Sequence, residues 1–369
     1  MDAELWEQTA VHRIRKIGKV NEAPTRLKEK RETMKALILK RYGSLEHVVF
    51  ADIPKPAIKP DEILVQIHAV GLNPIDYMIP KGTFKPILKF QLPVTLCSDL
   101  AGVVVEVGSQ VSKFKVGDAV YASIFDLGNG SLAEYAAVPE YAAAAKPLNL
   151  SFAEAASIPM VGLTSWQALT ERAQVKPGQK VFIPAGSGGI GTFAIQLAKQ
   201  LGAFVGTTTS TGNVDWVREL GADEVVDYRK QELEEVLQGY EAVIGTVRGN
   251  ALEKALRILK PQSKVVSLIG PPDAAFARDR GMNFMMRLVF GLMSRKIIRL
   301  ASRQDAWYSF LFVRPDGQQL STIGALLEGG KIRPVIDKKF SFENAKVGLT
   351  YLETGRAKGK VVIEVKTEI

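Results

Sequence analysis

Apolar and polar residues tend to alternate between positions 34 and 157, in short runs bounded by Gly, Pro and Asp. The runs are MKALILK (34–40), DEILVQIHAVGLN (61–73), LAGVVVEVG (100–108), DAVYAS (118–123) and LAEYAAV (132–138). A period of two places one set of side chains on one face of a pleated strand. The pattern therefore predicts a mainly β domain over 34–157.

From residue 158 the pattern lengthens, and short buried runs alternate with helical stretches. The predicted strands are KVFIPA (180–185), AFVGTTT (203–209), DEVVDY (223–228), EAVIGTV (241–247), KVVSLIG (264–270) and YSFLFV (308–313). The predicted helices between them are GGIGTFAIQLAKQLG (188–202), VDWVRELG (214–221) and ALEKALRILK (251–260). Such alternation is typical of a doubly wound parallel sheet with right-handed crossovers, and it predicts an α/β domain over 158–315. The strand, helix and strand pattern of 338–365 indicates that residues 316–369 return to the β domain.

The first 33 residues differ from the rest in being polar and highly charged, and Met34 follows them. They lack the apolar stretch of a secretory signal, and their six acidic residues argue against an organelle transit peptide. We expect a leader that is disordered or weakly helical and takes no part in the chemistry.

Composition narrows the class of protein. Of the 369 residues 46% are hydrophobic and 24% charged, as in soluble globular proteins, and no apolar run is long enough to cross a membrane. A single cysteine, Cys97, excludes an intrachain disulfide and a four-cysteine zinc site, and it indicates a reducing cytoplasm. The net charge of +9 is spread along the chain without a nucleic-acid-binding motif, so we expect a solvated basic surface and no nucleic-acid partner.

The segment VFIPAGSGGIGTFAIQ (181–196) contains G-x-G-x-x-G at Gly186, Gly188 and Gly191. The motif alone is weak, but here a buried strand precedes it and a helix follows it, as a dinucleotide site requires. The first glycine permits the tight turn, the second lets the backbone approach the pyrophosphate, and the third lets helix and strand pack closely. The alternative is a glycine-rich turn that binds no ligand.

The end of the second predicted strand bears on which dinucleotide binds. NAD sites usually place an acid there for the ribose hydroxyl, whereas this chain reads GTTTSTGN (206–213) and has no acid before Asp215. Since hydroxyls and backbone N–H groups tolerate a 2′-phosphate, NADP(H) is favoured over NAD(H). Arg218, Arg229 or Lys230 could supply positive charge, although each is more often a plain surface residue.

The scarcity of metal ligands bears on the substrate. The three histidines, His12, His47 and His68, are scattered, so hydride transfer to a plain ketone would lack the help of zinc. The string from Tyr77 to Lys81 matches Y-x-x-x-K, but Pro80 disfavours the helix that a short-chain dehydrogenase needs. A conjugated carbonyl delocalises the developing charge, and a few hydrogen-bond donors can stabilise the enolate. Enones, alkenals and quinones are therefore the expected substrates.

The order of these parts resembles the medium-chain dehydrogenase/reductase superfamily, and within it the zinc-free quinone oxidoreductase and enone (alkenal) reductase branch. The segments that carry the resemblance are GLNPIDY (71–77), residues 92–122, GSLAEYAAV (130–138), SIPMVGLTSWQAL (157–169), AGSGGIG (185–191) and GRAKGKVVI (355–363). The resemblance implies a GroES-like β-rich catalytic domain joined to a Rossmann domain. Zinc-bearing members place Cys near position 73 and Gly-His-Glu near 97–99, whereas this chain has Asn73 and Cys97-Ser98-Asp99.

The resemblance also implies a set of cofactor contacts. Ser187, Gly188, Gly189 and Ile190 would hold the pyrophosphate, and Ser210 and Tyr228 would lie near the 2′-phosphate, although the basic residue common in the family is replaced near there by Asn213. The residues implied around the ribose and nicotinamide are Thr164, Thr246, Val247, Leu268, Ile269, Gly270, Phe310, Leu311, Phe312, Lys358 and Lys360. The backbone of 310–312 would contact the nicotinamide amide.

On the substrate side, Asn73 and Tyr77 are the candidate catalytic residues, as donors to the carbonyl oxygen. Tyr77 could also pass a proton to the α-carbon, as could water. The alternatives are a turn-capping amide before Pro74 for Asn73 and simple packing for Tyr77. We interpret Asp76 as structural and Cys97 as a packed thiol.

Two functions follow from these observations. The first is an NADPH-dependent, zinc-independent reductase of conjugated carbonyls; the alternative is a non-catalytic nucleotide-binding or peripheral membrane protein of the same fold. The Met- and Arg-rich segment 281–300 could be a substrate lid, a peripheral membrane contact, or a packed helix or dimer element. Relatives often dimerise through the last Rossmann strand, so the resemblance implies a homodimer joined at 308–313.

Overall fold

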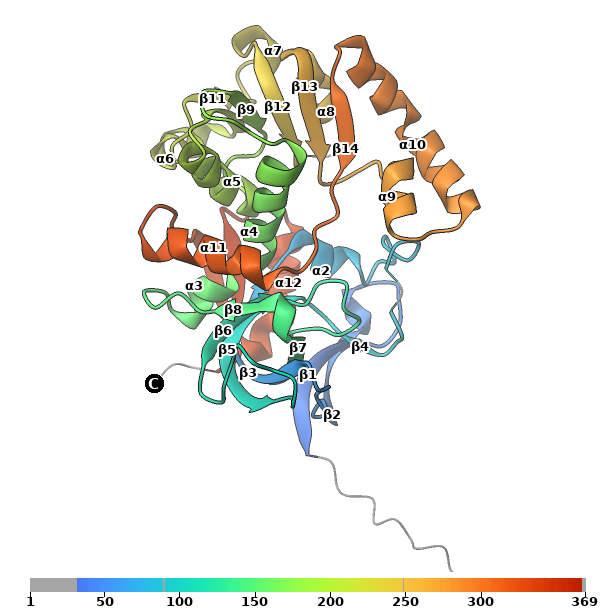
Figure 1. The fold of residues 1–369 in the computed structure, drawn as a ribbon, viewed down its shortest axis with the longest axis vertical. Coiled ribbons are helices and arrows are strands. Elements are labelled where there is room, and N and C mark those ends of the chain that lie inside the picture. Colours follow the sequence, from blue (N-terminus) through green and yellow to red (C-terminus); the bar gives the residue numbers. More distant parts are fainter. Residues whose placement is uncertain (1–31, 89, 248, 367–369) are drawn as a thin grey trace, which may run out of the picture. The chain divides into compact units, whose positions relative to one another are not determined.

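The computed structural model describes residues 32–88, 90–247 and 249–366. The expected leader therefore falls almost wholly outside the described residues. The segment from Met34 onward forms one compact unit. Figure 1 shows in it a parallel sheet with flanking helices, joined to a second region rich in antiparallel strands.

The β-rich region is built on two sheets. One has seven strands in the order β15-β16-β3-β5-β6-β8, with β7 paired to β3, and the other has the order β2-β1-β4. The strands are β1 Thr33–Leu39, β2 Val48–Pro54, β3 Glu62–Leu72, β4 Val94–Thr95, β5 Asp99–Val107, β6 Ala119–Ser123, β7 Tyr135–Pro139, β8 Ala143–Ala145, β15 Ile336–Ser341 and β16 Lys360–Glu364. Because β16 pairs antiparallel with β3, the distant segment after residue 336 completes this sheet.

The second region has six parallel strands in the order β11-β10-β9-β12-β13-β14. Their bounds are β9 Lys180–Ile183, β10 Phe204–Thr209, β11 Glu224–Asp227, β12 Tyr240–Gly245, β13 Leu259–Ser267 and β14 Trp307–Phe310. Numbered along the chain this is 3-2-1-4-5-6, the order of a dinucleotide-binding sheet. The α/β fold class expected from the sequence is confirmed.

Helices of very different length connect or cover these strands. In the described residues they are α2 Pro74–Met78, α3 Phe152–Ala156, α4 Pro159–Trp166 with a π-helical extension over Gln167–Arg172, α5 Gly189–Gln200, α6 Val214–Glu219, α7 Leu233–Val236, α8 Ala251–Leu256, α9 Ala274–Asp279, α10 Phe284–Arg303, α11 Gly317–Glu328 and α12 Ala345–Glu353. Single turns of 3-10 helix lie at Leu45–His47, Glu140–Ala142, Thr211–Asn213 and Phe342–Asn344.

Both faces of the parallel sheet are buried. Val181 and Ile183 of β9 enter the core cluster that includes α4 and α5, whereas Phe182 enters the cluster that includes α8 and α10. Adjacent residues of a strand point to opposite faces, so a strand covered on both sides must be apolar throughout. The sequence KVFI meets this requirement.

Several predicted elements end earlier in the structure than the sequence pattern suggested, among them one helix and the last strand of the parallel sheet. The helix predicted over 251–260 ends at Leu256, because Leu259 pairs with Tyr240 and opens β13. The strand predicted over 308–313 ends at Phe310, after which the Leu311 N–H donates to Ser267 O and the chain leaves the sheet. In the first case pairing with a neighbouring strand overrides the local helical pattern, and in the second the chain leaves the sheet although residues 311–313 are apolar.

Gly206 in the middle of β10 gives a test of the packing in the parallel sheet. A Cβ at this position would lie 2.0 Å from the hydroxyl oxygen of Tyr240, a side chain that is fully buried. We expect Gly206→Ala to destabilise the fold by about 1–3 kcal/mol, the usual cost of overpacking a core. Thermal unfolding followed by circular dichroism should show a melting temperature several degrees lower.

The matched control is Gly212→Ala, because a Cβ at Gly212 meets no atom within 4 Å. That variant should unfold with the wild type. Equal melting temperatures for Gly206→Ala and the wild type would show that Tyr240 can move aside without cost.

Candidate active site

The glycine-rich loop joins β9 to α5, and its three glycines meet different surroundings. A Cβ on Gly186 would lie 2.5 Å from Thr207 Oγ1, and one on Gly191 would lie 2.3 Å from Ala185 O. A Cβ on Gly188 would meet only Ala185 O, at 3.4 Å. Two glycines are therefore required by packing inside the protein, while the third leaves space open outside it.

The N-terminus of α5 opens onto that space. Gly188 is the N-cap residue, and no side chain caps the helix. Ser187, Gly189 and Ile190 are half-buried around it. Uncapped N–H groups and the positive end of the helix dipole suit an anion, so these residues fit a dinucleotide pyrophosphate.

At the end of β10 the side chains are hydroxyls and amides. Ser210 is half-buried, and its Oγ accepts a hydrogen bond of 3.0 Å from Asn213 Nδ2. The nearest carboxylate in register is Asp227 on the neighbouring strand, opposite Thr209. A hydrogen bond from the Thr211 side chain lowers the pKa of Asp227, so that acid is ionised one strand away from the expected ribose position.

The basic residues considered for this end of the site, Arg218, Arg229 and Lys230, are exposed, and two of them are paired with nearby acids. Lys230 Nζ lies 3.7 Å from Asp227 Oδ2, and Arg218 Nη1 lies 3.6 Å from Asp215 Oδ1. Tyr228 is 59% exposed beside them. Exposed pairs of this kind hold their side chains weakly, so these residues can reorient toward a ligand.

Several residues expected around the nicotinamide come together at the ends of β12 and β13. Val247, Ile269 and Gly270 line one hollow of about 290 Å³. Thr246 lies next to them and donates its hydroxyl to Pro184 O at 2.7 Å, which ties this strand end to the start of the glycine-rich loop. Thr164 is buried in α4, and Leu268 donates its N–H to Gly245 O.

The backbone of 310–312, expected to contact the nicotinamide amide, already makes hydrogen bonds within the protein. The Phe310 N–H donates to Asp273 Oδ2 at 3.3 Å, and the Leu311 N–H donates to Ser267 O at 2.9 Å. The Phe312 ring packs instead against Phe125 of the β-rich region, with ring centroids 5.1 Å apart. Two of the three N–H groups are therefore engaged within the protein.

The two lysines expected near the cofactor have different positions. Lys358 is exposed, whereas Lys360 is buried. The Gly359 N–H donates to Ser187 O at 2.9 Å, and the stem of Lys360 passes 3.3 Å from a Cβ built on Gly189. The start of β16 therefore runs directly beside the glycine-rich loop, and Lys360 continues from there toward the β-rich region.

The ammonium of Lys360 ends in a buried polar network. It donates to Asn73 Oδ1 at 2.6 Å and lies 3.4 Å from Asp99 Oδ2. The Asn73 Nδ2 donates to the same Asp99 oxygen at 2.9 Å. Burial lowers the pKa of Lys360 and raises that of Asp99, and the attraction between the two charges opposes both shifts. Breaking a buried pair of this kind leaves an uncompensated charge, so each partner depends on the other.

Asn73 also begins α2. Its backbone N–H donates to Asp76 Oδ2 at 2.7 Å, and Asp76 is buried. Burial raises the pKa of Asp76 from 3.8 to about 7. Asp76 therefore fixes the start of the helix that carries Tyr77, in line with the structural role expected for it.

Asn73 is the N-cap residue of α2 and Tyr77 lies within this helix, but their side chains differ in whether their polar groups are already hydrogen-bonded within the protein. Both polar groups of the Asn73 amide are engaged by Lys360 and Asp99. Tyr77 is half-buried, Lys81 Nζ lies 5.6 Å from its ring centroid, and no side chain within the described ranges is hydrogen-bonded to its hydroxyl. The Tyr77 hydroxyl is thus the better placed of the two to meet a ligand.

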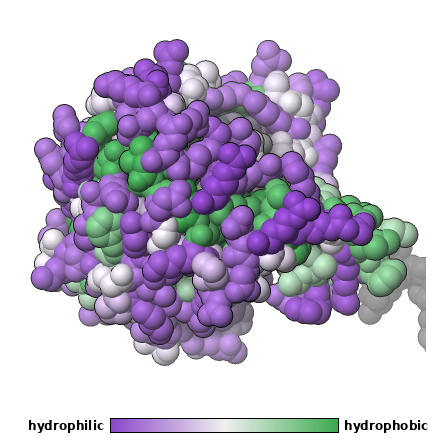
Figure 2. Space-filling view, turned by 90° about the horizontal axis from the view of Figure 1, so that it is seen from above, coloured by the Kyte–Doolittle hydropathy of each residue, from purple (hydrophilic) through white to green (hydrophobic). Residues whose placement is uncertain are grey.

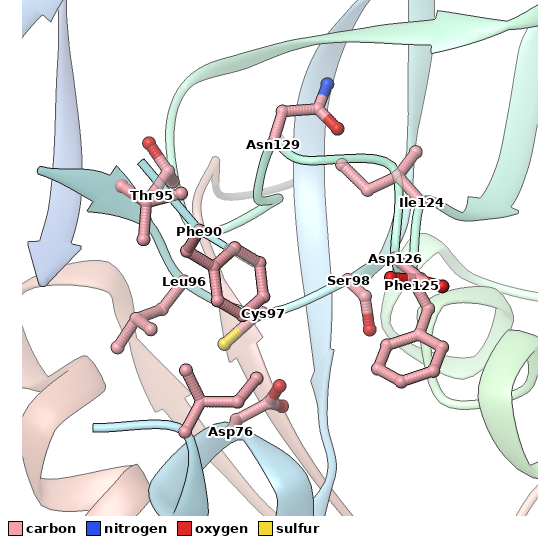
Figure 3. A pocket seen from close by; sticks show the side chains of 12 residues that line it. Asp76, Phe90, Thr95, Leu96, Cys97, Ser98, Ile124, Phe125, Asp126 and Asn129 are labelled. Carbon is pink, nitrogen blue, oxygen red and sulfur yellow. The ribbon is translucent and has the colours of Figure 1, made fainter. Parts of the chain in front are cut away.

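Beside this network lies a small, largely apolar hollow (Figure 3). Its walls include Asp76, Cys97, Ser98 and Phe125, and its volume is about 20 Å³. That is room for roughly one water molecule, not for a substrate. Burial raises the pKa of the Cys97 thiol well above its usual range, so Cys97 is a packed, protonated thiol.

Sequence reasoning missed a contact that bridges the two regions. Arg280, just after α9, donates to Asp126 Oδ2 at 2.6 Å. Its guanidinium also lies over the Phe312 ring, 5.0 Å from the centroid. The partners are 154 positions apart, so no local spacing could have indicated the pair.

Family models match two parts of the chain. The alcohol dehydrogenase GroES-like domain matches residues 59–148, and the family described as zinc-binding dehydrogenase matches residues 220–363. The second description belongs to the family as a whole. Within the described residues, no group of three or more His, Cys, Asp or Glu side chains is arranged to hold a metal ion.

Individual relatives match along most of the chain. A 2-methylene-furan-3-one reductase of Solanum lycopersicum is 37% identical over 89% of this chain and 79% of its own length. An NADPH-dependent alkenal/one oxidoreductase of Arabidopsis thaliana, described as chloroplastic, is 34% identical with the same coverage. The solved quinone oxidoreductase of Coxiella burnetii superimposes with a TM-score of 0.78 at 31% identity, over 91% of this chain and 100% of that one. The resemblance drawn from the sequence is confirmed: the chain belongs to the medium-chain dehydrogenase/reductase superfamily, among relatives that are quinone oxidoreductases and alkenal or enone reductases.

Proposed function

We propose that this protein is an NADPH-dependent reductase of conjugated carbonyls, such as enones, alkenals or quinones, that works without zinc. The observation that carries the proposal is the Lys360–Asn73–Asp99 network beside the glycine-rich loop. At the positions where zinc-bearing relatives place ligands, the chain has an amide bonded to an ammonium and a carboxylate. An ammonium is a donor and cannot bind a cation, so this donor set suits charge stabilisation by hydrogen bonds.

NADPH, when bound, supplies the hydride. The uncapped N-terminus of α5 would hold the pyrophosphate, and Gly188 leaves room for it. Ser210, Tyr228 and the exposed Arg229 and Lys230 would receive the 2′-phosphate. A carboxylate at Ser210 would repel that phosphate, and the nearest acid in register stands on the next strand instead.

Tyr77 is the proposed donor to the substrate. Its hydroxyl would hydrogen-bond the carbonyl oxygen as negative charge develops there, and it could return a proton to the α-carbon, as could water. Asn73 then acts as a positioning residue, since its amide is held by Lys360 and Asp99. The buried Lys360 ammonium places a positive charge next to the Asn73 amide.

We also propose a homodimer joined at β14. This strand forms one edge of the six-stranded sheet, and Trp307 at its start is 50% exposed. An unpaired edge with an exposed aromatic side chain suits pairing with the same edge of a second copy. A cytoplasmic location remains part of the proposal and rests on the single buried Cys97.

The first test is an assay of cofactor oxidation by the purified protein. Reduced nicotinamide absorbance is followed with NADPH or NADH against a short enone, a long alkenal, a quinone and a simple ketone. We expect oxidation of NADPH in preference to NADH, with the conjugated acceptors and not with the ketone. Turnover of the ketone would contradict the proposal, and binding of NADPH without any turnover would favour a non-catalytic nucleotide-binding protein.

Tyr77→Phe tests the proposed donor. Loss of the hydroxyl should lower kcat about 10²-fold, the usual contribution of a positioned proton donor, while the Kd for NADPH stays unchanged. Tyr141→Phe is the matched control, because Tyr141 is 53% exposed and lies in the turn before β8. A kcat for Tyr77→Phe equal to that of the control would assign the proton to water.

The buried carboxyl that starts α2 predicts a pH dependence of stability. The pKa of Asp76 is raised from its ordinary value of 3.8 to about 7 in the fold, so the folded state binds more protons between these values. The free energy of unfolding contributed by Asp76 should therefore fall as pH rises from about 4 to about 7. Asp76→Asn keeps an acceptor for the Asn73 N–H and removes the titration.

The measurement is thermal unfolding of both proteins across this pH range. The melting temperature of Asp76→Asn should rise relative to that of the wild type as pH rises toward 7. A constant difference between the two would show that folding does not raise the pKa of Asp76.

A further inference from the structure

Helix α10 has a large apolar surface that no other described part of the chain covers. Six of its side chains are between 38% and 78% exposed: Phe284, Met285, Leu288, Val289, Leu292 and Met293. Figure 2 shows hydrophobic side chains gathered at the right-hand edge, where α10 lies in Figure 1. Exposed apolar side chains in such a contiguous group mark an interaction surface.

The outward face of α10 changes character along its length. Residues spaced by three or four lie on one face of a helix, so Phe284, Leu288 and Leu292 are followed on the same face by Arg295 and Arg299. The opposite face is the buried one and carries Phe290, Ser294, Ile297 and Ala301. The exposed face is therefore apolar over its first half and cationic over its second half.

The charged side chains of α10 all carry positive charge. Its sequence contains five cations, Arg287, Arg295, Lys296, Arg299 and Arg303, and no carboxylate. Lys296 is paired with Glu253, at 2.6 Å. Arg295, Arg299 and Arg303 have no ion pair with any residue in the described ranges. The face thus presents an unbalanced positive charge directly beside exposed apolar side chains.

We propose that this face of α10 binds the surface of a membrane containing anionic phospholipids. Phenylalanine, leucine and methionine side chains enter the boundary between headgroups and acyl chains, and the arginines that follow meet lipid phosphates. No helix in the described part of the chain is long and apolar enough to cross a membrane, so this contact is peripheral.

The charge pattern favours lipid over a second copy of the chain. A second copy would bring the same unbalanced arginines to the interface, and like charges brought together cost affinity. An anionic lipid surface complements the positive charge of the arginines. Residues 284–286 and 288–293 carry no charge, so they suit contact with acyl chains, which form no hydrogen bonds. Met293 of this face also lines the hollow that contains Val247 and Gly270, so the proposed contact adjoins the proposed active site, but it does not depend on turnover.

The test is co-sedimentation of the full chain with vesicles. We expect binding to vesicles of phosphatidylcholine with phosphatidylglycerol, and binding weaker by roughly tenfold or more to phosphatidylcholine alone. The double variant Leu288→Glu/Leu292→Glu and the double variant Arg295→Glu/Arg299→Glu should each lose binding to the anionic vesicles by tenfold or more. Leu148→Glu is the matched control, because Leu148 is 92% exposed at a different site and should leave binding unchanged.

Light scattering of the same proteins separates the alternatives. A wild type that does not bind anionic vesicles would overturn the proposal. So would a change from dimer to monomer in Leu288→Glu/Leu292→Glu, because the face would then join two copies. NADPH binding by each variant, measured by quenching of tryptophan fluorescence, shows that the fold is retained.

Discussion

The buried ammonium of Lys360 is the interaction on which the rest of the structure depends. It joins three segments that are far apart along the chain: β16, the start of α2 at Asn73, and β5 at Asp99. The preceding Gly359 is hydrogen-bonded to the glycine-rich loop through Ser187. The same short stretch of chain therefore contacts both the glycine-rich loop and the start of α2, so a change in the position of one affects the other.

A charge buried this deeply costs free energy that only its partners offset. The attraction between Lys360 and Asp99 opposes the pKa shifts that burial imposes on both groups, and the Asn73 amide bridges them. The network has little freedom to rearrange, because every group in it is fixed by strand pairing or by a helix start. We interpret it as a rigid support for α2, the helix that carries the proposed donor Tyr77.

The regular parts of the fold could be predicted from the sequence, because their causes are local. Apolar alternation located the strands, and the glycine spacing located the loop before α5, where packing indeed requires Gly186 and Gly191. The sequence motifs contained Asn73, Asp99 and Lys360 but could not predict that they meet, since Lys360 lies 261 positions from Asp99. The helix predicted at 251–260 is too long for a related reason, because Leu259 pairs with Tyr240 of another strand.

The distance along the chain between Asp99 and Lys360 has a consequence for how the protein is made. Synthesis proceeds at about 5–20 residues per second, so Asp99 leaves the ribosome roughly 10–50 seconds before its counter-charge. During that time β5 can form, but its carboxylate must stay in contact with water. Burial of Asp99 in its ionised form therefore waits for β16, the last strand of the chain in the described residues.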